Sequence, residues 1–216
     1  MKNPLPCLTV SLLAPLVAHS AASLKLSAPL DYQVVQRTSA GIGMLTIAGE
    51  ILSPATNLTA VEVRVHSGNF SALRKLAARF DGGEFSAETD APAGGWYRVE
   101  VRVLNGDTVL AESAVEHVGV GEVFVVAGQS NSANHGAEKQ TTRTGRVATF
   151  DGRGWRLAND PQPGASGAGG SFLPPFGDAM AERFNVPIGE SQRELISSGS
   201  RAGLLVPPGY VGMLFC

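Results

Sequence analysis

Residues 97–103 read Tyr-Arg-Val-Glu-Val-Arg-Val, so apolar and charged side chains alternate along this run without a break. A period of two is the pattern of a strand that buries one face and leaves the other in water. Residues 61–65 repeat the pattern as Val-Glu-Val-Arg-Val. The two runs therefore predict half-buried strands of an antiparallel sheet.

Shorter apolar or alternating runs surround these two, at residues 24–26, 33–36, 44–48 and 108–111. Strands at such short spacing predict a small, immunoglobulin-like β-sandwich over residues 23–118. The segment 70–80 fits either a strand or one face of a helix, so its structure stays open.

A hairpin is expected where residues 97–103 are followed by residues 108–111. Asn105 and Gly106 lie between the two runs. An Asn-Gly pair tolerates the positive φ angles that a two-residue hairpin turn requires. The sequence therefore predicts a tight turn at Asn105-Gly106.

The pattern changes near residue 119. An apolar strand is predicted at residues 122–127, followed by a polar, glycine-rich stretch that reads as a flexible loop. Pro174 and Pro175 then suit a helix start, with apolar residues at helical spacing through Phe184. The full expectation is a β-sandwich followed by an incomplete α/β segment with a parallel sheet over residues 119–189.

Composition limits the function classes. The chain has 216 residues, 44% hydrophobic and 17% charged, with a formal charge of −2. We therefore expect a packed core. The sequence has no basic stripe, the feature that would indicate a nucleic-acid partner. No Cys/His pair has metal-ligand spacing, so neither a metal nor another cofactor is predicted.

Residues 1–22 have the features of a secretory signal. Lys2 supplies a positive charge, residues 8–17 form a short apolar region, and small residues follow at 20–22. The apolar region is shorter than the roughly 20 residues that a transmembrane helix needs. We therefore expect a secreted or periplasmic protein without a membrane span after cleavage.

The chemistry centres on residues 121–131, which read Gly-Glu-Val-Phe-Val-Val-Ala-Gly-Gln-Ser-Asn. A strand, a glycine turn and a serine two residues later would lift the Ser130 hydroxyl clear of a sheet edge. The alternative is an ordinary turn, because Gly, Ser and Asn are common turn residues.

This block resembles the nucleophile block of SGNH-type hydrolases, most of all the sialate O-acetylesterase-like carbohydrate esterases. The similarity continues at residues 169–172 and 185–189, and upstream at residues 32–37. It implies that Ser130 is the nucleophile. It also implies that Gly169 or Gly170 gives an oxyanion N–H, and that the substrate is an acetylated carbohydrate.

Three further residues are assigned around this serine. Gln129 and Asn131 flank it, and His135 follows five residues later. We expect all three to contact substrate, with His135 too close in sequence to be a good replacement base.

The general base is not apparent. The resemblance implies an Asp-x-x-His motif near the C-terminus, and no Asp in this sequence is followed three residues later by His. His66 and His117 fall in or beside predicted strands of the sandwich, so we expect them to be surface or packed residues.

Residues 190–216 depart from the family pattern, which continues after residue 189 with an apolar strand. They begin with the polar run Glu-Ser-Gln-Arg-Glu. We interpret them as an aberrant tail outside the fold, produced by a frameshift or a truncated gene model; a true family variant with a short C-terminus is the alternative.

Two alternative functions remain open. The sandwich could be a carbohydrate-binding or adhesion module that uses Trp96, Tyr97 and Trp155 to stack on sugar rings. The chain could also be an inactive fragment of the esterase.

Overall fold

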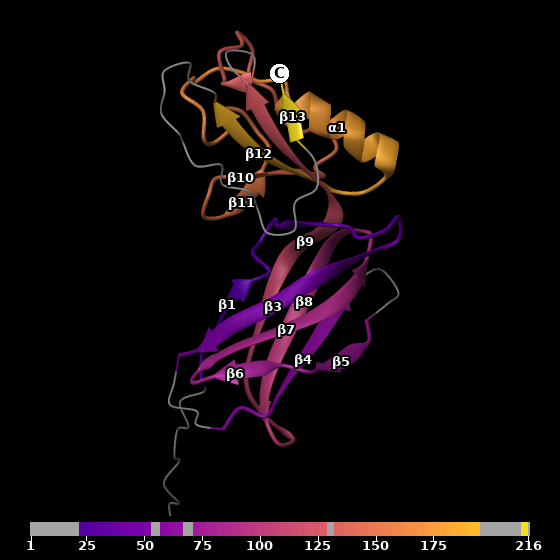
Figure 1. Ribbon diagram of the computed structural model, residues 1–216, viewed down its shortest axis with the longest axis vertical. Coiled ribbons are helices and arrows are strands. Elements are labelled where there is room, and N and C mark those ends of the chain that lie inside the picture. The colour runs from indigo at the N-terminus through magenta and orange to yellow at the C-terminus, as the bar shows by residue number, and fades with distance from the viewer. Residues whose placement is uncertain (1–21, 53–56, 67–70, 129–131, 195–212, 216) are drawn as a thin grey trace, which may run out of the picture.

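The computed structural model describes residues 22–52, 57–66, 71–128, 132–194 and 213–215. This part of the chain is mostly β, with one antiparallel sheet, one mixed sheet and a single helix (Figure 1). The predicted combination of a sandwich with a parallel α/β segment is confirmed.

The antiparallel sheet has the order β1-β3-β7-β6. Its strands are β1 (Leu24–Ala28), β3 (Ile42–Ile51), β7 (Glu84–Pro92) and β6 (Arg79–Asp81). In β7 the buried positions are Phe85, Ala87, Thr89 and Ala91. Three of these side chains are small or polar, which explains why apolar patterning did not reveal this strand.

The mixed sheet has the order β11-β10-β12-β9-β8-β4-β5. Its strands are β11 (Trp155–Leu157), β10 (Val147–Phe150), β12 (Ile188–Glu194), β9 (Thr108–Gly128), β8 (Gly94–Asn105), β4 (Ala60–His66) and β5 (Leu73–Leu76). Two short strands, β2 (Val34–Gln36) and β13 (Met213–Phe215), also pair with β9. The open segment 70–80 therefore contributes strands, not a helix.

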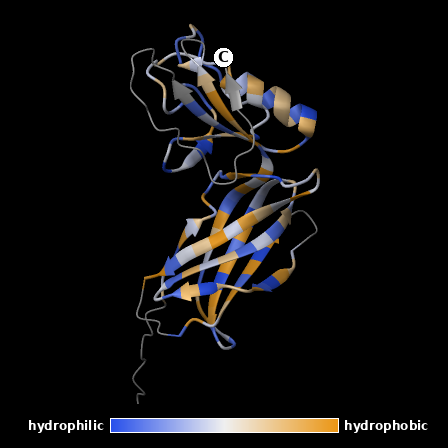
Figure 2. Cartoon of the chain, viewed as in Figure 1, coloured by the Kyte–Doolittle hydropathy of each residue, from blue (hydrophilic) through white to orange (hydrophobic). Residues whose placement is uncertain are grey.

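The sandwich core lies between the two sheets. Leu45 and Ile47 from β3 meet Val63 of β4 and Val99 and Val101 of β8, and none of the five is exposed to solvent. Figure 2 shows apolar and polar positions alternating along these strands. The alternation in the sequence therefore marks which side chains face this core.

The hairpin between β8 and β9 is present, one residue later than expected. Asn105 pairs with Thr108, so the two turn residues are Gly106 and Asp107. Gly106 has φ of 59°, in the left-handed region that glycine adopts at little cost. Asn105 remains in the strand and is not a turn residue.

Strand β9 connects the two parts of the fold. Its first half pairs antiparallel with β8, and its second half pairs in parallel with β12 from Ile188↔Glu122 to Glu194↔Gly128. The expected boundary between residues 118 and 119 falls inside this one continuous strand. Figure 1 shows β9 passing from the sandwich into the α/β part.

Helix α1 (Leu173–Phe184) has prolines in its first turn, as predicted. Its most buried positions are not the apolar residues of the predicted spacing. Leu173, Gly177, Asp178 and Ala181 are buried, whereas Phe184 is exposed. Small residues lie on this face because the helix packs close to Val147 and Glu190, and a Cβ at Gly177 would meet both side chains.

The interpretation of residues 190–216 as outside the fold is wrong for its first five residues. Residues 190–194 complete β12, and Glu190, Ser191 and Gln192 are buried. The hydrogen-bonding edge of β9 accepts this strand through backbone groups, whatever its side chains. Residues 213–215 pair with β9 as well, and residues 195–212 lie outside the described part.

The junction between the two parts is close-packed. A Cβ at Gly121 would overlap the carbonyl oxygen of Pro187, so only glycine fits there. Glu122 accepts hydrogen bonds from Arg37 Nε and Gln36 Nε2, each at 2.7 Å. Residues 32–37, which also resemble the esterase family, therefore contact the start of the nucleophile block.

Candidate active site

The carboxyl ends of β9, β12 and β10 lie at one edge of the mixed sheet, because these three strands run parallel. Ligands of open α/β sheets bind at this edge. Strand β9 ends at Gly128, two residues before Ser130. Gln129, Ser130 and Asn131 themselves lie outside the described residues, so their roles stay predictions.

The second sequence block meets the segment that follows Ser130. Gly136 and Gly170 form an isolated antiparallel bridge, with both N–H···O distances at 2.9 Å. Gly169 N donates to Asn134 O at 2.7 Å. The second block therefore lies beside residues 134–136, which follow the predicted nucleophile by a few positions in the sequence.

These bonds bear on the expected oxyanion role of Gly169 and Gly170. Both N–H groups already donate to backbone carbonyls, so a substrate oxygen would compete with them. A Cβ at Gly170 would overlap the carbonyl oxygen of Glu138. The glycines here allow close backbone packing, and the expectation of a flexible loop is wrong at these positions.

Buried and half-buried polar side chains hold the loops at this edge. Asp160 accepts from Ser171 N at 2.8 Å, from Ser171 Oγ at 2.7 Å and from Gln140 N at 2.9 Å. Asn134 exchanges two hydrogen bonds with the backbone of Gln162. The segments 134–140 and 160–171 are thus fixed to one another.

Asp178 on α1 likewise holds the loop at residues 142–144 through hydrogen bonds. It accepts from Thr142 Oγ1 at 2.8 Å, from Arg143 N at 2.7 Å and from Thr144 Oγ1 at 2.6 Å. Burial alone would raise the pKa of Asp178, but these hydrogen bonds outweigh it and lower the pKa overall. The helix is therefore fastened to the loop by an ionised carboxylate.

His135 is exposed and its Nε2 lies 3.2 Å from Ser166 Oγ. A serine and a histidine at hydrogen-bond distance are the pair that nucleophilic catalysis uses. No sequence pattern indicated Ser166, because the two residues are 31 positions apart. Ser166 is therefore a second serine to test beside Ser130.

The other two described histidines pair with carboxylates in the sandwich part. His66 Nε2 lies 3.2 Å from a carboxyl oxygen of Glu100, and the contacts with His66 and Arg98 lower the pKa of Glu100. His117 Nδ1 lies 3.0 Å from Asp31 and its ring stacks on Tyr32. The expectation of surface or packed histidines agrees with these contacts.

The aromatic residues of the alternative binding module are engaged in packing. Tyr97 is 8% exposed, with its hydroxyl donating to Pro92 O. Trp96 is half-buried against Tyr32, and its Nε1 donates to Gly145 O. Trp155 packs against Phe150, with ring centroids 5.3 Å apart. These contacts do not favour a sugar-stacking platform.

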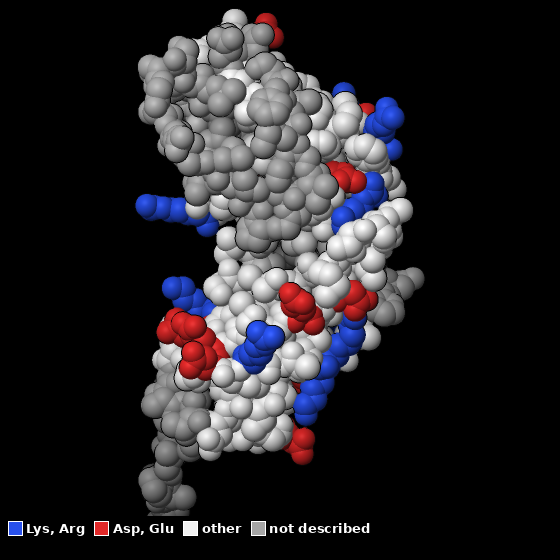
Figure 3. All heavy atoms as spheres, in the orientation of Figure 1, with Lys and Arg blue, Asp and Glu red and all other residues white. Residues whose placement is uncertain are grey.

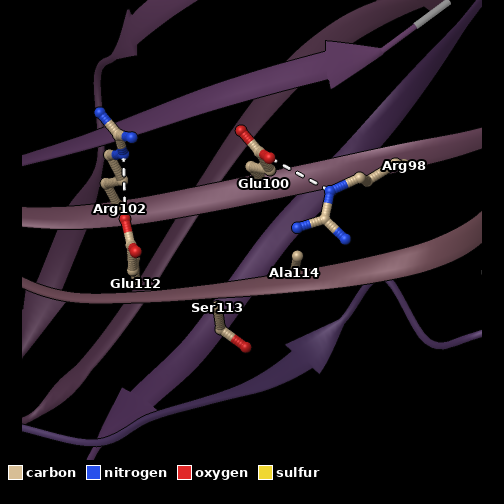
Figure 4. Close-up of a pocket in the computed structure, with 6 residues that line it drawn as sticks. All are labelled: Arg98, Glu100, Arg102, Glu112, Ser113 and Ala114. Carbon is tan, nitrogen blue, oxygen red and sulfur yellow. Dashed lines mark hydrogen bonds and ion pairs between the residues drawn. The ribbon is translucent and has the colours of Figure 1, made fainter.

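Two hollows differ in chemistry. One, of about 250 Å³, lies over β8 and β9, where Arg98 pairs with Glu100 and Arg102 with Glu112 (Figure 4). Its charges neutralise one another, and Figure 3 shows basic and acidic side chains mixed on the visible face. The other, of about 690 Å³, is lined by Gly136, Glu138, Gln140, Gly170, Ser171, Phe172 and Pro175. The second hollow lies at the Gly136–Gly170 bridge, where the second sequence block meets the segment after Ser130.

Glu190 is fully buried in β12, and burial raises its pKa well above the ordinary value, with Asp178 and Asp160 adding to the effect. Its two carboxyl oxygens have no hydrogen-bond partner among the described residues. The same holds for the side-chain amide of Gln192 and the hydroxyl of Thr149, its neighbours on that face. The sequence showed a polar run here but gave no sign of its burial.

Within the described residues, no helix is long and apolar enough to cross a membrane, and no three His, Cys, Asp or Glu side chains are grouped to hold a metal ion.

No protein-family model matches the chain, and no curated protein sequence matches it. Among solved structures, it is similar to a novel carbohydrate acetylesterase from Xanthomonas citri, with a TM-score of 0.45 and 20% identity over 76% of this chain and 38% of that one. An engineered protein follows with a TM-score of 0.32 and 16% identity, over 46% and 20% of the two chains.

The twitchin kinase region from C. elegans has a TM-score of 0.29 and 14% identity, over 46% of this chain and 16% of its own. The chain thus spans less than two fifths of the length of the acetylesterase. These likenesses are distant, and no function of this chain follows from them.

Proposed function

We propose that the α/β part carries the nucleophile of an exported carbohydrate O-acetylesterase, with Ser130 as the nucleophile. The observation that carries the proposal is the bridge between Gly136 and Gly170. It brings the second of the blocks that resemble the esterase family beside the segment that follows the first block, whose strand β9 has its carboxyl end at the edge shared by the parallel strands. That edge is the place where a serine after β9 would meet a substrate.

The reaction has two steps. Ser130 Oγ attacks the carbonyl carbon of the sugar acetate while a base takes the hydroxyl proton. The tetrahedral intermediate collapses, the C–O bond to the sugar breaks, and the sugar oxygen leaves with that proton as an alcohol. Water then attacks the acetyl-serine and releases acetate.

The described residues near this part of the chain differ in the catalytic or binding role that each could have. His135 lies beside the Gly136–Gly170 bridge, where it would contact the substrate. The N–H groups of Gly169 and Gly170 are engaged with backbone carbonyls, so we do not carry the oxyanion role over to them. The family's Asp-x-x-His motif does not occur in this sequence. Without that base, turnover falls on the order of 10⁶-fold in a model serine protease.

Chemical rescue tests the proposal. The full chain and its Ser130→Ala variant are compared in acetate release from an O-acetylated methyl xyloside, with and without added imidazole. Without imidazole we expect equal rates, because the family's Asp-x-x-His base does not occur in this sequence. With imidazole as the external base, only the chain with Ser130 should release acetate faster.

A Ser166→Ala variant is the matched control, since it removes the serine beside His135 and leaves Ser130 in place. Its rescued rate should equal that of the unchanged chain. Loss of the rescue in Ser166→Ala with retention in Ser130→Ala would overturn the assignment of the nucleophile.

A further inference from the structure

The hollow beside the Gly136–Gly170 bridge has the size and lining of a sugar subsite. Its volume of about 690 Å³ lies within the roughly 300–1,000 Å³ of small-molecule pockets. Phe172 and Pro175 supply apolar surface, and Glu138 and Gln140 supply polar groups. A pyranose needs both, because its ring has an apolar C–H face and a polar rim of hydroxyls.

The walls of this hollow are fixed in place. Gln140 and Ser171 both donate to Asp160, and Gly170 is held against Gly136. Phe172 contacts Phe176 of α1, with ring centroids 6.1 Å apart. A pre-formed wall lowers the entropy that binding costs.

The charge of the hollow limits which sugars fit. Among the described residues that line it, Glu138 is a carboxylate and none is a lysine or arginine. Asp160 lies directly behind Gln140 and Ser171 and adds a second negative charge. A ligand carboxylate would be repelled by both, whereas neutral hydroxyls would donate to Glu138.

We propose that this hollow binds a neutral pyranose beside the acetyl group and disfavours anionic sugars such as sialic acids. The proposal rests on the proposed function, and it narrows the substrate class relative to the family that the sequence resembles.

The test is binding to the Ser130→Ala chain, which cannot consume the ligand through Ser130. Calorimetric titrations compare an O-acetylated methyl xyloside with O-acetylated N-acetylneuraminic acid. We expect the neutral sugar to bind at least about tenfold more tightly, since a hydrogen bond to a charged group is a strong one. Equal or tighter binding of the acidic sugar would overturn the proposal.

Two variants locate the binding. Glu138→Lys should weaken binding of the neutral sugar about fivefold to tenfold and strengthen binding of the acidic one, because the charge of an exposed side chain is reversed. Phe172→Leu keeps apolar volume but removes the ring face, so a loss of about threefold is expected. Glu88→Lys on β7 is the matched control and should change neither affinity.

The subsite and the nucleophile assignment can each fail without the other. If imidazole rescue through Ser130 succeeds but Glu138→Lys leaves the ratio of the two affinities unchanged, the subsite is wrong and the nucleophile stands. If the rescue fails while both variants act as expected, the subsite stands without the esterase.

Discussion

Glu190 is the residue whose environment fits its chemistry least. It lies in the centre of the parallel sheet beneath α1, fully buried, and Asp178 and Asp160 are near. An unpaired charge in such a place is costly, and the group becomes neutral instead. The folded chain therefore holds a proton on Glu190 that the unfolded chain releases at neutral pH.

This proton gives stability a pH dependence of definite sign. Above the ordinary pKa of 4.5 and below the raised folded value, the folded state binds one more proton than the unfolded state. The free energy of unfolding should then fall by up to about 1.4 kcal/mol per pH unit as the pH rises. Glu190→Gln should remove this slope, and Glu190→Leu should be more stable than either at neutral pH.

Urea unfolding between pH 4.5 and 7 measures both effects, with Glu190→Gln as the control for the lost charge. The groups with lowered pKa values, Asp178, Asp151 and Glu100, act at lower pH and do not mask the slope. Parallel profiles for the unchanged chain and Glu190→Gln would show that Glu190 is not buried in this way.

At the scale of elements, the junction between β9 and the turn before β12 depends on Gly121. A Cβ there would overlap the carbonyl oxygen of Pro187, which is backbone and cannot rotate away. Gly121→Ala should lower the free energy of unfolding by about 1–3 kcal/mol, as overpacking does. Gly41→Ala is the matched control, because a Cβ at Gly41 meets nothing within 4 Å.

Denaturant titration of the two alanine variants checks this prediction. A loss of the same size in both would contradict the prediction, because Gly→Ala without a clash stabilises through the unfolded chain, and the contact with Pro187 would then not decide the effect.

Patterning in the sequence predicted the elements whose side chains alternate or form apolar runs. It located β1, β3, β4 and β8 because each of these strands contributes to the sandwich core. It missed β7, whose buried positions are mostly small, and it did not indicate that Gly177 and Asp178 lie on the buried face of α1, where close approach selects them. Such choices depend on neighbours distant in sequence, which no local window contains.

The candidate site was predictable to a different degree. The sequence blocks at residues 121–131 and 169–172 indicated a shared site, and the Gly136–Gly170 bridge brings the second beside the segment after the first. The contact of His135 with Ser166 and the loop support from Asp160 join residues far apart in sequence. Neither has a local pattern, so neither could be predicted.

At the scale of the whole molecule, β9 joins the antiparallel strands of the sandwich and the parallel strands of the α/β part into one sheet. Its first half completes the sandwich, and its second half is the central strand of the parallel part. The segment 34–37 reinforces this connection, through the pairing of β2 with β9 and through the ion pair of Arg37 with Glu122 at 2.6 Å. The sandwich thereby positions the strand that leads to Ser130.

If Ser130 is the nucleophile, it becomes acetylated during turnover, and the most direct measurement identifies the side chain that carries the acetyl group. The full chain is incubated with 4-nitrophenyl acetate and imidazole, quenched, digested and mapped by mass spectrometry. We predict an acetyl group on Ser130, lost in Ser130→Ala and retained in Ser166→Ala. Acetylation of Ser166 or of surface lysines alone, with Ser130 unmodified, would contradict this account.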